Sequence, residues 1–295
     1  MTSIFKKSEL KKLYIPNKNS SGEDNGSVTI IGGSKLFHGA PILSLKVASR
    51  LVDMVFFATP EKPVGYVAEQ IKSKLMSFVW VPWADTEAYI AKSDAILIGP
   101  GFMRFDSEKT PENKRGDISD GEGKVTRDIT ERLLKAHPTK RWVIDAGSLQ
   151  VMDVGWIPKG AIITPNQKEF SFLFGIKNDE LSIMDGKAKT HIVSSMAAKH
   201  KCTIVLKGPE TIVASPSETV VVKGGNAGMT KGGTGDILAG LTVSLLAKNE
   251  PLLAASAASF IEKKAADELY NEVRIGYNAD DLADRIPSTF KKLTG

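Results

Sequence analysis

Short apolar runs rich in β-branched residues alternate with helical patterns along most of this chain. The strand-like runs are Val28–Ile31, Met54–Ala58, Phe78–Val81, Ala95–Ile98, Trp142–Asp145, Ala161–Thr164 and Thr203–Leu206. Helices or parts of helices are expected between them at Pro41–Leu51, Val64–Leu75, Lys124–Ala136, Gln167–Phe174 and Lys187–His200. This alternation is typical of a parallel sheet covered by helices on both faces. The sequence therefore predicts an α/β protein, a three-layer α/β/α sandwich.

The pattern changes after Lys207. Thr211–Ala214 and Thr219–Val222 are strand-like but are separated by only a short polar turn. Because a parallel crossover needs a much longer connection, an antiparallel hairpin should close one edge of the sheet. The polar, glycine-bearing stretch from Phe105 to Gly123 is expected to be a surface excursion without a core of its own.

Length and composition favour one compact catalytic domain. The 295 residues contain no Pro/Gly/Ser linker, so a single domain 1–295 is expected, with residues 1–23 as an N-terminal extension packed on it or trailing from it. Hydrophobic residues make up 42% and charged residues 25%, which is typical of a globular protein and excludes extensive disorder. The net charge of +5 is spread along the chain, so nucleic acid is not expected as a partner.

Cysteine usage and hydropathy favour a cytoplasmic location. The single Cys202 permits no internal disulfide and lies in an apolar stretch, where a buried, unreactive thiol is expected. The N-terminus lacks the apolar centre of a signal peptide, and no stretch approaches the roughly 18 apolar residues of a membrane span. A membrane is therefore not expected as a partner either.

The segment from Gly224 to Gly240 is the clearest candidate for a functional site. It has six glycines from Gly224 to Gly235, then Asp236, then an apolar run whose spacing predicts a helix that Pro251 ends. Glycines allow successive N–H groups to turn toward an anion, and the following helix adds its positive end. An aspartate there would repel phosphate unless it deprotonates a hydroxyl that attacks phosphorus. The plainer alternative is a surface loop in which Asp236 is an ordinary acid of a helix first turn.

Two other nucleotide-binding patterns do not fit. Lys231 precedes the tight GGTG turn instead of following it, so this is not a P-loop. The stretch GGSKLFHGA after the first strand lacks GxGxxG, and Asp53 precedes its strand, so a dinucleotide-binding fingerprint is set aside. No His, Cys, Asp and Glu cluster has zinc spacing.

Unusual residues follow five of the predicted strands. Ligands of open parallel sheets gather beyond the carboxyl ends of the strands, so these residues should share one rim. They are Gly32-Gly33 with His38 to Pro41, Gly99-Pro100-Gly101, Asp145-Ala146, Thr164-Pro165-Asn166 with Glu169, and Lys207-Gly208. Each has a structural alternative: a tight turn for Gly99–Gly101, a solvated lysine for Lys207, a loop histidine for His38 and a first-turn helix acid for Glu169.

Taken together, these segments resemble the ADP/ATP-dependent NAD(P)H-hydrate dehydratases of the ribokinase-like superfamily. The motifs occur in the family's order from about residue 24 to 250. They are DNGSVTIIGGS at 24–34, GAPILS at 39–44, IGPG at 98–101, VIDA at 143–146, TPNQKE at 164–169, VLKG at 205–208 and GNAGMTKGGTGDILAG at 225–240. The resemblance implies the ribokinase-like sandwich, and repair of hydrated nicotinamide cofactor, (S)-NADHX or (S)-NADPHX, back to NADH or NADPH.

The resemblance also implies roles for individual residues. The residues themselves suggest that Asp236 is the catalytic base, with the amides of the GGTG turn as an anion hole. The hydrated cofactor is implied to touch Ala40, Gly101 and Asp236. Bacterial relatives usually have a histidine where this chain has Asn166, which can donate a hydrogen bond but cannot carry a proton, so Asn166 is a binder at most. The adenine nucleotide is implied to lie on Lys207, Gly208, Pro209, Glu210, Thr211 and Gly235, and the anion hole consists of Gly232, Gly233, Thr234 and Gly235.

Further expectations concern cofactors, assembly and rival functions. Mg²⁺ is expected with the nucleotide, with Glu169 as a candidate contact, and ADP is favoured over ATP as donor. A homotetramer is implied by the family. A contact from Ser21–Asp24 is in doubt because the family's usual His-Lys-Gly is altered there. The alternatives are a small-molecule kinase of the hydroxyethylthiazole type, which shares the glycine-rich aspartate motif, and a nucleotide sensor without turnover.

Overall fold

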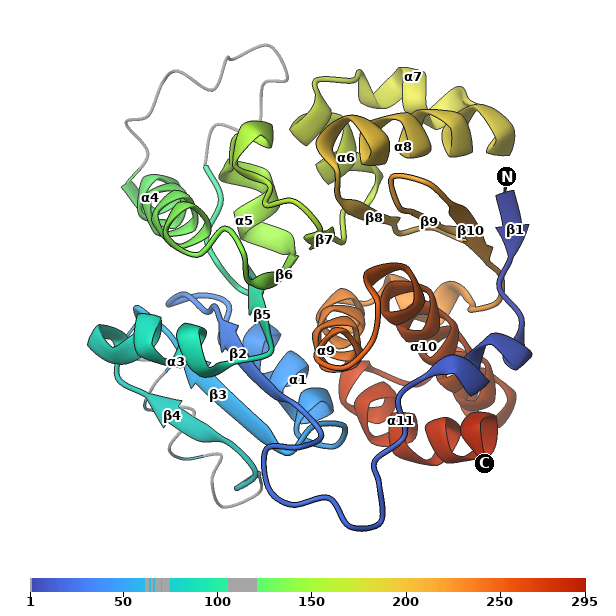
Figure 1. Ribbon diagram of the computed structural model, residues 1–295. Helices are drawn as coiled ribbons and strands as arrows, with labels where there is room; N and C mark the ends of the chain where they lie inside the picture. The colour runs from blue at the N-terminus through green and yellow to red at the C-terminus, as the bar shows by residue number, and fades with distance from the viewer. Residues whose placement is uncertain (1, 62–63, 65, 67–69, 71–74, 106–120) are drawn as a thin grey trace.

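The computed structural model describes residues 2–61, 64, 66, 70, 75–105 and 121–295, which form a ten-stranded sheet with the order β1-β10-β9-β8-β7-β6-β5-β2-β3-β4 (Figure 1). From β8 to β4 the neighbouring strands are parallel, and β9 pairs antiparallel with both β8 and β10. The strands are β1 (Thr2–Ile4), β2 (Ser27–Ile31), β3 (Met54–Ala58), β4 (Val79–Val81), β5 (Ala95–Ile98), β6 (Arg141–Ile144), β7 (Ile162–Ile163), β8 (Thr203–Leu206), β9 (Thr211–Ala214) and β10 (Thr219–Val222).

All nine predicted strands are confirmed, with ends that coincide with the predicted ones or differ by one residue. The predicted hairpin β9–β10 lies at one side of the sheet, and β1 adds to its outer strand in parallel. β1 has no alternating apolar pattern and all three of its residues are exposed, so no sequence pattern predicts it. The N-terminal segment also packs inward, because the ring centroids of Phe5 and Phe260 lie 5.3 Å apart.

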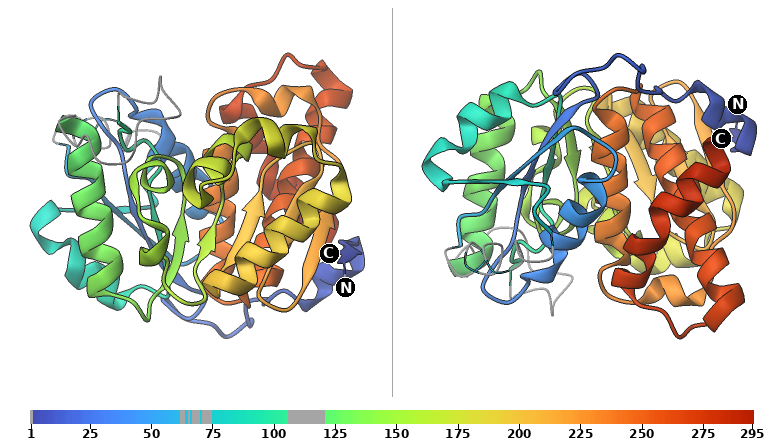
Figure 2. Two further views of the ribbon diagram at one scale, coloured as in Figure 1. Left: turned by 90° about the horizontal axis from the view of Figure 1, so that it is seen from above. Right: turned by 90° about the horizontal axis from the view of Figure 1, so that it is seen from below.

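The helices cover both faces of the sheet. One group, α1, α9, α10 and α11, lies on one face, and α3 to α8 lie on the other (Figures 1 and 2). Their bounds are α1 (Gly39–Ala48), α3 (Thr86–Lys92), α4 (Gly121–Ala136), α5 (Ala146–Val151), α6 (Gln167–Phe174), α7 (Asn178–Ile183), α8 (Gly186–His200), α9 (Thr234–Leu246), α10 (Pro251–Val273) and α11 (Ala279–Thr294). Short 3₁₀ turns are η1 (Lys7–Lys12), η2 (Trp83–Asp85), η4 (Val154–Trp156) and η5 (Ala227–Thr230).

Alternate side chains of each strand feed two hydrophobic cores. In β2, Val28 and Ile30 join the core beneath α1, α9, α10 and α11, whereas Ile31 joins the core beneath the other helices. This follows from the two-residue period of a strand, whose successive side chains point to opposite faces. The predicted three-layer sandwich is therefore confirmed. Cys202 is fully buried, as predicted, and burial raises the pKa of its thiol to about 12.

Several helix boundaries differ from the predicted ones. The prediction that Pro251 ends the helix after Asp236 is wrong: α9 ends at Leu246, and Pro251 is the first residue of α10. Proline suits that position because the first N–H of a helix has no intrahelical acceptor. Residues 121–123, predicted as part of a surface excursion, begin α4, while 106–120 and most of the helix predicted at 64–75 lie outside the described residues.

None of the helices in the described part of the chain combines the length and the apolar character that crossing a lipid bilayer requires.

Candidate functional site

The predicted site residues lie at the carboxyl-end edge of the parallel strands. Ala40 follows β2, Gly101 follows β5, Asn166 follows β7, and Lys207 follows β8. Because β2, β5, β6, β7 and β8 are parallel neighbours, their carboxyl ends lie at the same edge of the sheet. The glycine-rich segment enters the same region, since a Cβ at Gly235 would lie 3.4 Å from Lys207 Nζ.

The structure brings Gly101 against the start of α1, where Ala40 lies. Gly101 has a φ of +73°, and a Cβ there would lie 2.5 Å from the Phe37 carbonyl oxygen and 2.9 Å from Pro41 Cδ. Only glycine fits such an approach without displacing backbone. Gly99–Gly101 is thus more than an isolated turn, because it packs on the segment that opens α1.

Asp145, Glu169 and Lys207 form a buried charged group, which we call the carboxylate cluster. Lys207 Nζ lies 3.0 Å from Asp145 Oδ1 and 3.8 Å from Glu169 Oε2, and the Thr164 hydroxyl donates to Asp145 Oδ1 at 2.8 Å. The side chains of Asp145 and Glu169 are 2% and 8% exposed. Burial acts against the charge of Lys207, but the two carboxylates outweigh it and raise the lysine pKa. Lys207 is therefore not a solvated lysine.

Asn166 and Glu169 form a reciprocal cap at the start of α6. The Glu169 N–H donates to Asn166 Oδ1 at 2.9 Å, and the Asn166 N–H donates to Glu169 Oε2 at 2.8 Å. Gln150 Nε2 also donates to Glu169 Oε1 at 3.0 Å. Burial raises the pKa of Glu169, although Lys207 opposes that shift. Glu169 is thus a first-turn helix acid, as the structural alternative predicted, and also a member of the carboxylate cluster. Its contact with Mg²⁺ stays a prediction.

The glycine loop, residues Gly224–Gly235, presents free amides where α9 begins. The N–H groups of Gly232, Gly233 and Gly235 donate to no acceptor within the described part of the chain. The Thr234 hydroxyl donates to the Met229 carbonyl at 2.7 Å and so holds the loop closed. Unsatisfied amides at a helix N-terminus attract anions. The arrangement fits the anion hole predicted at Gly232–Gly235.

Asp236 lies in the first turn of α9, immediately after these amides. Its backbone carbonyl accepts from the Ser44 hydroxyl at 2.7 Å, which ties α9 to α1. Burial, with a further contribution from Asp145, raises the pKa of Asp236 to about 7, against the opposing attraction of Lys207. A carboxyl that titrates near neutral pH is suited to take up a proton during a reaction.

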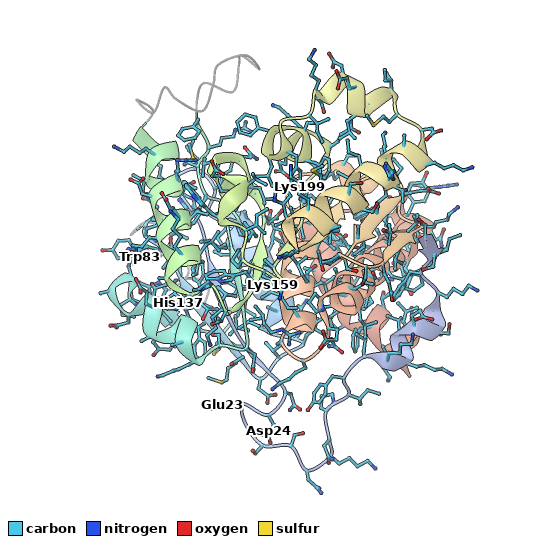
Figure 3. All side chains as sticks on the ribbon, turned by 45° about the horizontal axis from the view of Figure 1, so that its top comes forward. Glu23, Asp24, Trp83, His137, Lys159 and Lys199 are labelled. Atoms are coloured by element: carbon cyan, nitrogen blue, oxygen red, sulfur yellow. The ribbon has the colours of Figure 1, made fainter. Side chains whose placement is uncertain are left out.

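Some candidates are not brought to this edge. Ser21–Asp24 precedes β2, so it lies at the amino-end edge, and Glu23 and Asp24 project from a loop away from the helices (Figure 3). Asp24 there accepts hydrogen bonds from Ser21 at 2.7 and 2.9 Å. Within one chain this stretch therefore lies at the edge opposite the other candidates. His38, by contrast, lies at the carboxyl-end edge, directly before α1, and its Nε2 is buried without a partner among the described residues.

Sequence reasoning missed Lys263, a buried lysine of α10. Its Nζ donates to the carbonyls of Gly208, Pro209 and Gly224 at 3.1, 2.8 and 2.9 Å. These carbonyls belong to the predicted nucleotide segment and to the start of the glycine loop. No sequence signal distinguishes Lys263 from the adjacent Lys264, which is 41% exposed. Asp145 was visible as the acid after a strand, but its pairing with Lys207 needed the fold.

Comparison with known proteins gives the family. A family model described as NAD(P)H-hydrate dehydratase matches residues 28–288. An ADP-dependent (S)-NAD(P)H-hydrate dehydratase of Cenarchaeum symbiosum is 30% identical over 285 residues, covering 94% of this chain and 93% of the relative. A bifunctional NAD(P)H-hydrate repair enzyme of Hyperthermus butylicus is 33% identical over 281 residues, covering 89% of this chain but 48% of the relative. The chain thus spans about half the length of the bifunctional relative.

A solved structure shows the same fold. The ADP/ATP-dependent NAD(P)H-hydrate dehydratase of Bacillus subtilis, co-crystallised with ATP and Mg²⁺, has a TM-score of 0.76 at 22% identity, covering 99% of this chain and 98% of that one. This likeness confirms the ribokinase-like sandwich predicted from the sequence. Because the family model matches most of this chain, the chain belongs to the NAD(P)H-hydrate dehydratase family.

Proposed function

We propose that this chain dehydrates (S)-NADHX and (S)-NADPHX to NADH and NADPH, with ADP or ATP as phosphoryl donor. The observation that carries the proposal is the placement of Asp236, whose pKa is about 7, directly after the free amides of Gly232, Gly233 and Gly235. A base and an anion cradle at one helix start suit transfer of a phosphoryl group to a hydroxyl. Family membership supplies the substrate class.

The chemistry begins at the C6 hydroxyl of the hydrated ring. Asp236 takes the hydroxyl proton as the oxygen attacks the terminal phosphorus, and the bond from that phosphorus to the nucleotide's bridging oxygen breaks. The loop amides stabilise the charge that develops on the transferred group. The ring nitrogen then expels phosphate from C6, and loss of the C5 proton to solvent water restores the C5–C6 double bond. One hydrate and one nucleotide give one dihydronicotinamide, one phosphate and the shortened nucleotide.

Nucleotide and substrate are assigned to opposite sides of Asp236. Lys207–Thr211 and Gly235 are proposed to hold the adenine nucleotide, supported by the approach of Lys207 Nζ to Gly235. Ala40 and Gly101 are proposed to contact the hydrate, supported by their proximity at the start of α1. Asn166 is proposed to offer its amide N–H₂ to a ligand, because its side-chain oxygen already caps α6. ADP is the proposed donor, since the Cenarchaeum symbiosum relative is named ADP-dependent.

Mg²⁺ fits this site as a partner of the nucleotide. Within the described residues no group of three or more His, Cys, Asp and Glu side chains could hold a metal ion alone. Both oxygens of Glu169 already accept hydrogen bonds. The arrangement suits Mg²⁺ held by phosphates and water, with Glu169 accepting from a bound water. When bound, the ion would neutralise phosphate charge.

The test is an assay on enzymatically prepared NADHX, with ADP and ATP in parallel. The expected result is recovery of dihydronicotinamide absorbance with stoichiometric release of free phosphate, faster with ADP. Phosphorus NMR of the products separates the rival kinase, because a kinase of the hydroxyethylthiazole type leaves a persistent phosphomonoester. Nucleotide binding without either product would indicate a sensor and would overturn the proposal.

A homotetramer and a cytoplasmic location complete the proposal. The homotetramer comes from the resemblance to the family, whereas the cytoplasmic location comes from cysteine usage and hydropathy. The homotetramer is checked by light scattering on the purified chain. A monomer in that measurement would overturn the assembly without affecting the proposed reaction.

A further inference from the structure

Lys263 is held in an unusual environment for a lysine. It is 4% exposed, and its Nζ contacts three backbone carbonyls, those of Gly208, Pro209 and Gly224. Three acceptors require three N–H donors, which only the ammonium form supplies. Burial lowers the pKa of Lys263, against the attraction of Glu262, Asp267 and Glu210. Keeping the Lys263 ammonium charged in this buried position therefore costs free energy, and the three hydrogen bonds offset that free-energy cost.

The carbonyls bound by Lys263 fix the direction of two amides. In a trans peptide the C=O and the following N–H point in opposite directions, and the described residues contain no cis peptide bond. The Pro209 and Gly224 carbonyls point at the ammonium, so the N–H groups of Glu210 and Gly225 point away from it. Neither N–H donates to an acceptor within the described residues. Two free donors are thus oriented by one side chain.

The two segments joined by this ammonium are far apart in the sequence but adjacent in the site. Gly208 and Pro209 follow β8, whereas Gly224 follows β10 and opens the glycine loop. The lysine stem also packs on that loop, because a Cβ at Gly225 would lie 3.1 Å from Lys263 Cγ. The next residue, Lys264, donates to none of these carbonyls: its Nζ lies 3.6 Å from Asp267 and 3.7 Å from the position of a Cβ at Gly224, and its side chain is 41% exposed.

We propose that Lys263 is a positioning residue for the adenine nucleotide, which holds the turn after β8 and the glycine loop so that the amides of Glu210 and Gly225 donate to acceptor atoms of that nucleotide. The inference rests on the proposed function for the identity of the ligand. It predicts a role in nucleotide affinity for a residue that donates no hydrogen bond of its own to the ligand.

The test compares Lys263→Met with Lys264→Met, which removes the neighbouring ammonium of the same helix. Isothermal titration with ADP, without hydrate, measures the nucleotide Kd. We expect Lys263→Met to weaken ADP binding at least tenfold and Lys264→Met to change it less than twofold. In turnover, the KM for ADP should rise while the KM for hydrate stays within about threefold at saturating ADP, a split that a general loss of stability does not produce.

A second variant guards against misfolding. Lys263→Arg keeps the charge, but its planar fork cannot direct three N–H groups at converging carbonyls, so a smaller loss of ADP affinity is expected. Circular dichroism establishes that each variant is folded. A folded Lys263→Met or Lys263→Arg protein with wild-type ADP affinity would overturn the inference, and so would a fall in melting temperature without weaker ADP binding.

Failure of the inference is distinguishable from failure of the proposed function. If wild-type protein turns over hydrate with ADP while Lys263→Met binds ADP normally, only the inference is wrong. If wild-type protein binds ADP without turning over hydrate, the proposed reaction is wrong and the titrations still decide the role of Lys263.

Discussion

The two sides of the candidate site, the carboxylate cluster and the glycine loop, differ in which groups carry their charge. In the carboxylate cluster the charges belong to side chains, with Asp145 and Glu169 facing Lys207. In the glycine loop the partial charges belong to the backbone, with free amides at one end and the Gly224 carbonyl, bound by Lys263, at the other. Both regions bury a lysine, yet carboxylates raise the pKa of Lys207 whereas burial lowers the pKa of Lys263.

This difference separates two functions. Side-chain charges alter the proton affinity of a neighbouring acid, so the carboxylate cluster can set the pKa of Asp236. Backbone dipoles do not titrate, so the glycine loop can bind an anion equally well over a wide pH range. Changes in the cluster should therefore move the pH dependence of turnover, and changes in the loop should weaken nucleotide binding. Asp236 lies where the two regions meet.

The largest effect is expected for Asp236→Asn, which removes the base and keeps the loop. Size and shape are barely changed, so the amides should bind ADP with an affinity within about threefold of wild type. Turnover should fall by about a thousandfold or more, within the range of general base catalysis. Steady-state kinetics and ADP titration measure the two quantities. Near-normal turnover in this variant would show that another group takes the proton.

The next effect in size is expected for Gly233→Ala in the glycine loop. Gly233 has a φ of +95°, and a Cβ would lie 2.5 Å from Leu43 Cδ1 and 2.8 Å from Ala279 Cβ. Strain of about 2 kcal/mol in the bound loop corresponds to roughly thirtyfold weaker ADP binding. The midpoint of the pH–rate profile should stay unchanged.

Gly232→Ala is the matched comparison, because a Cβ at Gly232 meets no described atom within 4 Å and the variant keeps its N–H. It should lose much less ADP affinity than Gly233→Ala. Equal losses in both variants would indicate that the loop needs flexibility at both positions rather than room at one.

The sequence predicted the sheet and the glycine loop well because both are local patterns. Strands buried on both faces, such as Ala95–Ile98, form continuous apolar runs, and the GGTGD turn has few alternative structures. Position after a strand end also sufficed to place Asn166 and Lys207 at one edge. The β1 strand was not predicted, because three exposed residues show no alternation of apolar and polar side chains.

What the sequence could not supply was the pairing of distant residues. Lys207 lies 62 positions from Asp145, and Lys263 lies 54 positions from Pro209. Such contacts depend on which strands are neighbours and on how α10 packs. Neither can be recognised from the residue types at these positions. The wrong interpretation of Pro251 has a similar origin, because a proline after a helix signals a stop or a new start equally well.

A smaller but diagnostic effect is expected for Lys207→Met in the carboxylate cluster. Lys207 opposes the shift of the Asp236 pKa, so its removal should raise that pKa above about 7. At pH 7 more Asp236 is then protonated, and kcat/KM should fall by about tenfold beyond any loss of nucleotide binding. The pH–rate midpoint should move upward. Loss of one partner of a buried pair should also destabilise the fold by about 3 kcal/mol.

Lys223→Met is the comparison for this variant. Lys223 Nζ lies 3.1 Å from Glu210 and its side chain is 57% exposed, so the pair is solvated and contributes little. Its removal should leave the midpoint of the pH–rate profile in place. A midpoint that moves as far as in Lys207→Met would mean that general charge, and not the cluster, sets the pKa of Asp236.

The smallest effect, and the sharpest test of the division between the two regions, is expected for Asp145→Asn. In wild type, Asp236 must be ionised to act as a base, so kcat/KM should fall as pH decreases below about 7. Asp145 raises that pKa, so neutralising Asp145 should move the midpoint of the pH–rate profile downward by up to about one pH unit, opposite in sign to Lys207→Met.

Asp128→Asn is the control, because Asp128 is an exposed acid of α4, and it should leave the midpoint unchanged. The ADP affinity of Asp145→Asn should stay close to wild type, because the loop amides are unchanged. If the midpoint stays fixed while ADP binding weakens, the carboxylate cluster acts on nucleotide binding and not on the pKa of Asp236. The two regions would then not have separate functions.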